Sequence, residues 1–448
     1  MRRVDLTEGS VPVHLTKLTV PMIGGLFAII AFNLTDTYFV ARLGTAELAA
    51  ISFTFPVVMV VGALAMGLGM GLSSVVSRAI GQGDGDQVRR LTTDGLILSF
   101  LVVLVFAIGG VLTLEPLFGR LGAPPEMMPL IRQYMVVWYT SVAVLVIPMV
   151  GNNAIRATGD AFTPSLIMML SAGVNVILDP ILIFGLLGAP RLELFGAALA
   201  TAIARAISMV AALWVLYHRC GLLDFSRPSF ARLWRSWRAI FHVALPSAAT
   251  NLLMPVMQGV VVRLAAGFGT ATVAAVGAGV RIEGFALLVP MAVGSALLPF
   301  VGQNWGARRR ARVRRGQRLS MGFSFTWGVL CLLGLQWAAT PVARLFSDDA
   351  AVVRELTLFL RILPLAYGFG PINAYITLSL NAIGAPGRAA LVSVGRLALI
   401  TLPAAVIGAK MGSSAGLFLG IALGNILAAC ASWWFGRGPF LQESIEES

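Results

Sequence analysis

Long apolar stretches, each able to span a bilayer as a helix, recur along the whole chain. They lie near residues 18–41, 51–77, 95–118, 130–150, 162–187, 195–217, 240–265, 272–300, 319–342, 356–380, 389–409 and 414–435. About 20 apolar residues cross the hydrocarbon core as an α-helix, whereas barrel strands are shorter and strictly alternating. The sequence therefore predicts an all-α membrane protein with twelve transmembrane helices. The composition agrees, since 58% of the residues are hydrophobic and only 12% are charged.

Positive charge is concentrated in three of the predicted loops. The net charge is +13 at pH 7, and the Arg-rich loops follow the second, sixth and eighth spans, which end on the same side of the membrane. Their basic residues are Arg78, Arg89, Arg90, Arg219, Arg227, Arg232, Arg235, Arg238, Arg308, Arg309, Arg310, Arg312, Arg314, Arg315 and Arg318. By the positive-inside rule this side is cytoplasmic and carries both termini. Because the rule accounts for the charge, we expect the lipid bilayer as a partner and no nucleic acid.

Residues that could carry catalysis or bind a structural metal are scattered. The cysteines and histidines are Cys220, Cys331, Cys430, His14, His218 and His242. Their spacing fits neither a zinc site nor a redox pair. Gly67, Gly69 and Gly71 form a GxGxG inside an apolar span, where close helix packing explains them better than nucleotide binding. We therefore expect no enzyme activity and no cofactor.

One six-helix unit occurs twice in the sequence. Segments 18–21 and 44–50 recur 225 residues later, and Gly81-Gln82 recurs as Gly302-Gln303, 221 residues later. An even number of spans in each copy gives both copies the same orientation, a layout found in secondary transporters that bind substrate between their halves. The predicted domains are an N-terminal lobe at 1–217, an Arg-rich linker at 218–239 and a C-terminal lobe at 240–448.

Two carboxylates, Asp36 and Asp179, lie within predicted spans. An ionised side chain at membrane depth is costly, so it is retained mainly where it binds protons, ions or substrates; the alternative is an acid that reaches the interface or pairs with an Arg. Two neighbouring carboxylates cannot both stay ionised cheaply, so we expect a proton or a sodium ion to neutralise them. The second copy has Val261 and Ala404 at the equivalent positions, so only the first copy carries the pair.

Asn175 and Asp179 are four residues apart and therefore share one face of a helix. Pro180 follows directly and frees a backbone carbonyl in the preceding turn, because proline has no N–H. Carboxylate, amide and carbonyl oxygens are the hard ligands that a small cation accepts. The alternative is an Asn–Asp hydrogen bond that joins helices.

Four motifs occur in a fixed order: Asn33-Leu34-Thr35-Asp36-Thr37, Arg156-Ala157-Thr158-Gly159-Asp160, Asn175-Val176-Ile177-Leu178-Asp179-Pro180 and Val301-Gly302-Gln303-Asn304-Trp305-Gly306-Ala307. With the spans and the repeat, they resemble the multidrug and toxic compound extrusion (MATE) transporters over about residues 10–435. The resemblance implies two six-helix lobes that export cationic or amphipathic small molecules in exchange for protons or sodium. It also implies a multi-pass protein of the bacterial cytoplasmic membrane, and we expect a monomer.

The branch with DNA-damage-inducible and archaeal members is the more similar one, because predicted helices seven and ten contain no carboxylate. The cation-coupling site that this branch implies comprises Asp36, Asn175, Asp179 and Thr201, which would also be the metal ligands if the ion is sodium. Asn33, Tyr134 and Asn152 are expected neighbours. Arg205 is a departure: it would disfavour sodium if it reached Asp179, and the alternative is a structural pair or a side chain that reaches the interface.

Three further positions have predicted roles. Pro21 removes a helical hydrogen bond, so it is a candidate hinge in the first helix. Met257 could contribute to a soft wall for varied substrates, with ordinary packing as the alternative. Glu283 is expected to pair with Arg263 of the neighbouring helix or to occupy a polar cavity position; the functional alternative is a cytoplasmic-side contact with a cationic substrate.

Two other functions compete with cation-coupled export. A flippase for a lipid-linked precursor, from the same superfamily, would need basic residues along a central cavity and usually extra helices. An intramembrane enzyme would need a paired catalytic constellation, which Asp36 and Asp179 could imitate but which no motif supports. The acidic pair and the twelve spans favour an exporter; its substrate and its coupling ion stay open.

Overall fold

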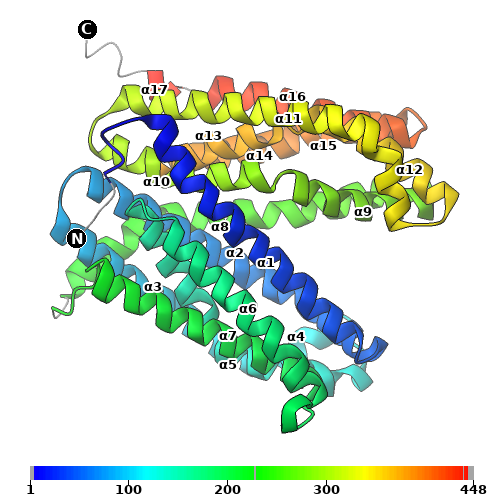
Figure 1. The fold of residues 1–448 in the computed structure, drawn as a ribbon, viewed down its shortest axis with the longest axis horizontal. Helices are drawn as coiled ribbons and strands as arrows, with labels where there is room; N and C mark the ends of the chain where they lie inside the picture. The colour runs from blue at the N-terminus through cyan, green and yellow to red at the C-terminus, as the bar shows by residue number, and fades with distance from the viewer. Residues whose placement is uncertain (1–4, 227–228, 437, 442–448) are drawn as a thin grey trace. The chain divides into compact units, whose positions relative to one another are not determined.

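The computed structural model describes residues 5–226, 229–436 and 438–441. They are almost entirely helical, and no strand occurs among them (Figure 1). The first copy of the repeat forms α1 (Val11–Ala41), α2 (Thr45–Gly81), α3 (Gly85–Leu112), α4 (Leu114–Arg120), α5 (Met128–Ala157), α6 (Phe162–Phe184) and α7 (Glu193–Trp214). Short 3-10 turns at Pro125–Met127 and Leu186–Gly188 precede α5 and α7, and a π-helical turn at Val215–Arg219 follows α7.

The second copy begins with α8 (Phe230–Ala266), α9 (Thr270–Ala286), α10 (Leu288–Gly306), α11 (Arg310–Phe346), α12 (Ala350–Ile362) and α13 (Gly370–Ala382). It continues with α14 (Pro386–Gly395), α15 (Leu402–Lys410), α16 (Ser414–Gly436) and the short α17 (Gly438–Leu441). A 3-10 turn at Leu363–Ala366 follows α12, and a π-helical turn at Arg396–Thr401 joins α14 to α15.

Ten of the described helices are long and apolar enough to span a membrane, and α9 with α10 forms an eleventh span that bends by 51°. The prediction of an all-α membrane fold is confirmed. The prediction of one continuous helix at 356–380 is wrong, because α12 ends at Ile362 and α13 begins at Gly370. Pro364 and Pro371 lie in the break, and proline cannot donate the hydrogen bond that would continue a helix.

Helix α3 begins ten residues before the apolar run that predicted it, at Gly85 rather than at residue 95. Asp84 caps this start, because its carboxylate accepts a hydrogen bond from the Gln87 N–H at 2.8 Å. The additional turns place Asp94 inside the helix, with no exposed surface. Asp94 directly precedes the apolar run at 95–118, so the sequence pattern did not predict it as part of the helix.

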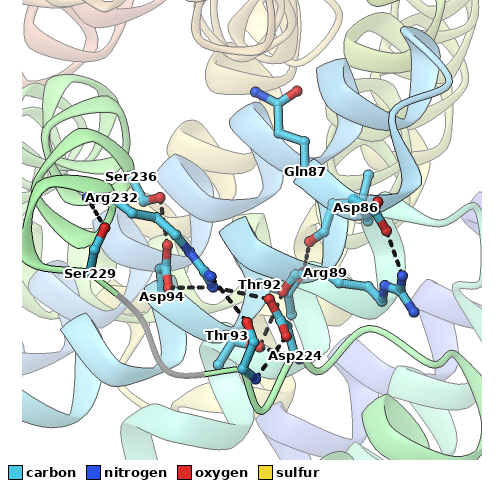
Figure 2. Close-up of polar contacts among 12 residues, drawn as sticks. Asp86, Gln87, Arg89, Thr92, Thr93, Asp94, Asp224, Ser229, Arg232 and Ser236 are labelled. Carbon is cyan, nitrogen blue, oxygen red and sulfur yellow. Dashed lines mark hydrogen bonds and ion pairs between the residues drawn. The ribbon is translucent and has the colours of Figure 1, made fainter.

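Asp94 anchors the start of α8 to α3 (Figure 2). Its carboxylate accepts a hydrogen bond from the Ser236 hydroxyl at 2.6 Å and lies 3.6 Å from a guanidinium nitrogen of Arg232. The Trp237 indole N–H donates to the backbone carbonyl of Asp94 at 2.9 Å. A buried carboxylate is tolerated only with such partners, so these contacts explain how an acid is accommodated here.

The linker between the copies also contacts Arg232. Arg232 donates to the Asp224 carboxylate at 3.1 Å, and the Asp224 N–H donates to the Thr93 hydroxyl at 2.8 Å (Figure 2). Hydrogen bonds from the N–H and the hydroxyl of Ser226, together with the charge of Arg232, outweigh partial burial and hold the pKa of Asp224 below its ordinary value. Arg227, also in the predicted linker, lies outside the described residues.

The chain divides into two compact units whose boundaries fall inside helices. The first unit includes Val20–Ala248, and the second includes Leu6–Thr19 with the residues from Ala249 onward. Helices α1 and α8 therefore each contribute to both units. The division differs from the sequence-based lobes, whose boundary is the linker at 218–239.

The motif at 301–307 holds the segment before α1 within the second unit. The Leu6 N–H donates to the Gln303 side-chain oxygen at 3.2 Å, and the Asn304 amide donates back to the Leu6 carbonyl at 3.1 Å. Both side chains have no exposed surface. Buried amides need such partners, so this motif has a structural role.

Close helix packing accounts for the GxGxG of α2, as predicted. A Cβ at Gly67 or Gly71 would approach the carbonyl oxygens of Ala244 and Ile240 in α8 to 2.5 and 2.6 Å, respectively. A Cβ at Gly69 would overlap the Asn153 side chain in α5. Glycines at these positions let neighbouring backbones approach, which is how membrane helices commonly associate.

Candidate functional site

Helices α6 and α7 hold three of the four predicted cation-site residues together. The Asn175 amide donates to one Asp179 oxygen at 3.0 Å and lies 3.4 Å from the Thr201 hydroxyl. Asn175 and Asp179 have no exposed surface. The helices are also joined on one side of this cluster, because the Ser171 and Ser208 hydroxyls donate across the interface to backbone carbonyls at 3.2 and 3.5 Å.

Two oxygen atoms of this cluster have no hydrogen-bond partner. They are the side-chain oxygen of Asn175 and the second carboxylate oxygen of Asp179, and both are buried. A buried polar atom without a partner is costly, so each such atom in a folded protein needs an explanation. Carboxylate, amide and hydroxyl oxygens form the donor set that a small hard cation accepts, and the carboxylate can equally accept a proton. The residues therefore fit either coupling ion.

Asp36 approaches the cluster from α1, which packs against α6. Phe32 forms a small apolar cluster with Ala28 and Ala172, and the Phe39 ring lies 6.1 Å from the Phe184 ring. Asp36 is half-buried, and its carboxylate is close enough to repel the carboxylate of Asp179 electrostatically. The structure thus brings Asp36 near the three residues of α6 and α7, as the sequence predicts, and the effect is a concentration of negative charge.

Arg205 of α7 lies beside Asp36 rather than forming a direct ion pair with Asp179. Its guanidinium carbon is 4.7 Å from the centre of the Phe32 ring, which is a cation–π arrangement. Phe32 and Asp36 are four residues apart, so they share one face of α1, and the Arg205 charge attracts the Asp36 carboxylate. The Nε of Arg205 is buried without a hydrogen-bond partner. Arg205 therefore belongs to the charge cluster.

The weaker predicted neighbours differ in their placement. Tyr134 of α5 is half-buried, and the charges of Asp36 and Asp179 both act on its phenol. Asn152, farther along α5, is buried and its side-chain oxygen has no partner. Asn33 is exposed, and its backbone carbonyl accepts a hydrogen bond from Thr37 at 2.8 Å. Of the three, Tyr134 is the one that the structure brings to the acidic pair.

The candidate residues of the second unit form no comparable cluster. Glu283 in α9 is half-buried and makes no ion pair with Arg263 among the described residues, so that expected pair is wrong. Met257 in α8 is half-buried. Among the described residues, no group of three or more His, Cys, Asp or Glu side chains could hold a metal.

Arg396 is a residue that the sequence analysis missed. It is half-buried at the start of the π-helical turn between α14 and α15, and its guanidinium lies 4.0 Å from the Met254 sulfur. A π-turn within an α-helix often marks a functional position, and an arginine in a membrane segment normally needs a partner. The sequence could have indicated Arg396, because it is a basic residue inside the apolar run at 389–409.

A duplicated bundle of membrane helices, with a buried cluster of an acid and an amide in one copy, is the arrangement expected of a membrane transporter. The MatE family model matches residues 21–181 and 246–407, one match in each copy of the repeat. The chain belongs to the MatE family of transporters, so it is a membrane transporter and not an enzyme.

Three relatives illustrate this membership. The chain is 37% identical over 425 residues to a protein of Shewanella oneidensis named "FAD transporter", with 94% of each chain covered. It is 26% identical over 353 residues to the "Probable multidrug resistance protein NorM" of Halalkalibacterium halodurans, covering 78% of this chain and 75% of the relative. The crystal structure of the Vibrio cholerae MATE transporter VcmN in the bent form superposes with a TM-score of 0.92, at 31% identity, over 97% of this chain and 98% of that one.

Proposed function

We propose that the protein is a secondary active antiporter that exports amphipathic or cationic small molecules in exchange for protons or sodium by alternating access. The observation that carries this proposal is the buried pair of unpartnered oxygens on Asn175 and Asp179, beside the charge of Asp36. An ion that neutralises this cluster removes the cost of holding two carboxylates together. The name of the NorM relative supports multidrug export.

Neutralisation would act on export through α1. Phe32 and Phe39 pack this helix against α6, and Asp36 lies between them in sequence. Pro21 cannot donate a helical hydrogen bond to the carbonyl of Lys17, so α1 lacks one backbone hydrogen bond at this turn and bends there more easily. The boundary between the two units, at Thr19 and Val20, lies beside Pro21. We propose that ion binding changes the packing of α1 on α6 and bends the helix at Pro21.

The test is transport by purified full-length protein in liposomes, with pH and sodium gradients imposed separately. Ethidium efflux should respond to one gradient in the wild type, and this response should fall about 10- to 100-fold in Asp36→Asn. The matched control is Val261→Asn, the same amide at the equivalent position of the second copy, which should transport like the wild type. Gradient-driven export by Asp36→Asn at the wild-type rate would refute the coupling role of Asp36.

Thr201 separates the two coupling ions. Its hydroxyl is an oxygen ligand for sodium but is not needed to protonate Asp179, so Thr201→Val should abolish sodium-driven export and leave proton-driven export active. Equal export by Thr201→Val and the wild type under a sodium gradient would show that Thr201 is no sodium ligand.

A second substrate class is FAD, because the relative named "FAD transporter" is 37% identical along 94% of both chains. FAD carries a flavin with an apolar face and an anionic diphosphate, so its recognition needs positive charge. Arg396, half-buried without a carboxylate partner among the described residues, would supply such a charge. Competition between FAD and ethidium in the same liposomes distinguishes the substrates: inhibition of ethidium export by lumenal FAD supports a shared pathway, and FAD export without ethidium export would replace the multidrug proposal.

A further inference from the structure

A cavity of about 250 Å³ lies in the second unit, lined by residues of α11, α13, α16 and α17. Its polar lining comes from α11, which contributes Arg314, Gln317 and Arg318. Its apolar lining includes Met321, Ile376 and Trp433. The cavity thus combines two guanidinium groups with a wall of hydrocarbon and indole, and the cation cluster of α6 and α7 contributes nothing to it.

The four lining residues of α11 are spaced as one face of a helix. Positions 314, 317, 318 and 321 follow the i, i+3, i+4, i+7 pattern, so their side chains point in a common direction. Arg314 is half-buried and donates to the Phe440 carbonyl at 3.3 Å, which leaves other N–H groups available. Arg318 is exposed. The described residues that line the cavity include no carboxylate, and neither arginine forms an ion pair with a described acid.

The position along α11 also bears on the ligand. The helix begins at Arg310, within the Arg-rich segment that the positive-inside rule assigns to the cytoplasmic side. Arg314 and Arg318 follow one and two turns later, and Trp433, which is 40% exposed, belongs to the last turn of α16. Tryptophan is enriched at the level of lipid headgroups. Arginines in the first turns of a span and a tryptophan at the end of another are the features expected where headgroup phosphates meet the first acyl carbons.

We propose that this cavity binds an anionic phospholipid of the cytoplasmic leaflet. The guanidinium groups of Arg314 and Arg318 hold the phosphate, for which the planar arginine fork is suited. Met321, Ile376 and Trp433 contact the start of an acyl chain. A volume of about 250 Å³ is below the range of roughly 300–1,000 Å³ for pockets that enclose drug-sized ligands. The cavity therefore suits a headgroup with the first part of its chain better than a transported compound.

The experiment is native mass spectrometry of the purified full-length protein titrated with phosphatidylglycerol or phosphatidylcholine of the same acyl chains. Arg318→Gln should weaken phosphatidylglycerol binding about fivefold, which corresponds to the roughly 1 kcal/mol that one basic side chain contributes near an anionic lipid surface. Arg314→Gln/Arg318→Gln should weaken it further. The matched control is Arg315→Gln, which removes the same charge from an exposed neighbour outside the cavity and should bind like the wild type.

Three results would overturn the proposal. Equal binding of phosphatidylglycerol by Arg318→Gln and Arg315→Gln would show that the cavity arginines have no special role. Equal binding of phosphatidylcholine and phosphatidylglycerol would remove the requirement for anionic charge. Displacement of the lipid by an equal concentration of glycerol 3-phosphate would show that the site recognises free phosphate and not a lipid. Arg318→Gln suffices if the double variant misfolds, because the exposed Arg318 side chain leaves packing intact.

Discussion

Helices α6 with α7 and α15 with α16 occupy corresponding places in the two copies of the repeat, yet their interfaces are built from different chemistry. Between α6 and α7, Asn175 and Asp179 form a buried polar cluster that retains unpartnered oxygens. Between α15 and α16, Ala404 takes the position equivalent to Asp179 and lies against two glycines. A Cβ at Gly420 would overlap the Ala404 carbonyl oxygen, and one at Gly424 would lie 3.0 Å from the Ala404 Cβ.

The difference shows how duplication separates fold from function. Close approach of two backbones stabilises a helix pair in a membrane through van der Waals contact, and it leaves no space for a carboxylate with a bound ion. The α6–α7 pair also approaches closely at one end, where a Cβ at Gly196 would meet the Leu182 carbonyl, but its polar centre keeps ligand atoms available. The first copy therefore carries the candidate chemistry, whereas the centre of the corresponding interface in the second copy is occupied by Ala404 and glycines. The predictions below test this division.

The largest effect should come from neutralising the acidic pair. Asp36→Asn and Asp179→Asn should each lower gradient-driven export about 10- to 100-fold, the range expected when the coupling between two bound ligands is lost. Because both acids bind the same ion, the double variant should be hardly worse than either single variant. Initial rates of ethidium efflux from liposomes measure this, with Val261→Asn as the control. Losses that multiply in the double variant would mean that the two acids act independently.

The buried anchor of α8 provides a second contrast between the copies. Asp94→Ala should lower the free energy of unfolding by about 2–4 kcal/mol, because the Ser236 hydroxyl loses its acceptor and Arg232 keeps only Asp224 as a partner. At the offset of 221 residues, the equivalent position in the second copy is Arg315, which is exposed.

Arg315→Ala is therefore the matched control for Asp94→Ala, and it should change stability by less than about 0.5 kcal/mol. Unfolding of the detergent-solubilised variants, followed by tryptophan fluorescence, gives both values. Similar losses in the two variants would show that burial of Asp94 contributes no special stability.

The close packing of α15 on α16 predicts a smaller loss of stability. Gly420→Ala should cost about 1–3 kcal/mol, because the added methyl group meets backbone atoms of Ala404, which cannot rotate away. Gly395→Ala, in α14, has no atom within 4 Å of the added Cβ and should be neutral. Thermal unfolding of the two variants in the same detergent tests this. A Gly420→Ala variant as stable as Gly395→Ala would contradict the tight interface.

The smallest effect concerns pH. Hydrogen bonds from Ser226, with the charge of Arg232, hold the folded-state pKa of Asp224 below its unfolded value of about 3.9. A lowered acid pKa gives stability that is present above the unfolded pKa and is lost as pH falls through the folded value. The linker should therefore loosen below about pH 4. Hydrogen exchange of the linker amides should show this in the wild type, and Asp224→Asn should remove that pH dependence.

The helices and the duplication were predictable because they follow from local and periodic properties of the sequence. An apolar run of membrane length predicts a helix whatever its neighbours are. The tenth apolar run does not form one continuous helix, because Pro364 and Pro371 lie in the break between α12 and α13. Helix α3 begins before its apolar run, because Asp84 caps an earlier turn. Helix ends depend on caps and prolines more than on hydropathy. Asp94 was missed because the apolar run did not extend to the true helix start.

The sequence predicts which residues form the candidate site, but only part of how they are arranged. Asn175 and Asp179 lie four residues apart, so the sequence alone places them on one face of a helix. That Thr201 lies 3.4 Å from the Asn175 amide depends on how α7 packs on α6.

The sequence by itself determined the class of fold, the duplication and the types of residue in the acidic cluster, because helix formation in lipid depends on local hydrophobicity. Only the tertiary structure decided which polar atoms find partners. It placed Arg205 over Phe32, left Glu283 without Arg263 and gave Asp94 the partners Ser236 and Arg232. These outcomes depend on distances between residues far apart in the chain. The packing of the helices sets those distances, and because it excludes water, a buried charge can pair only with the side chains that packing brings near it.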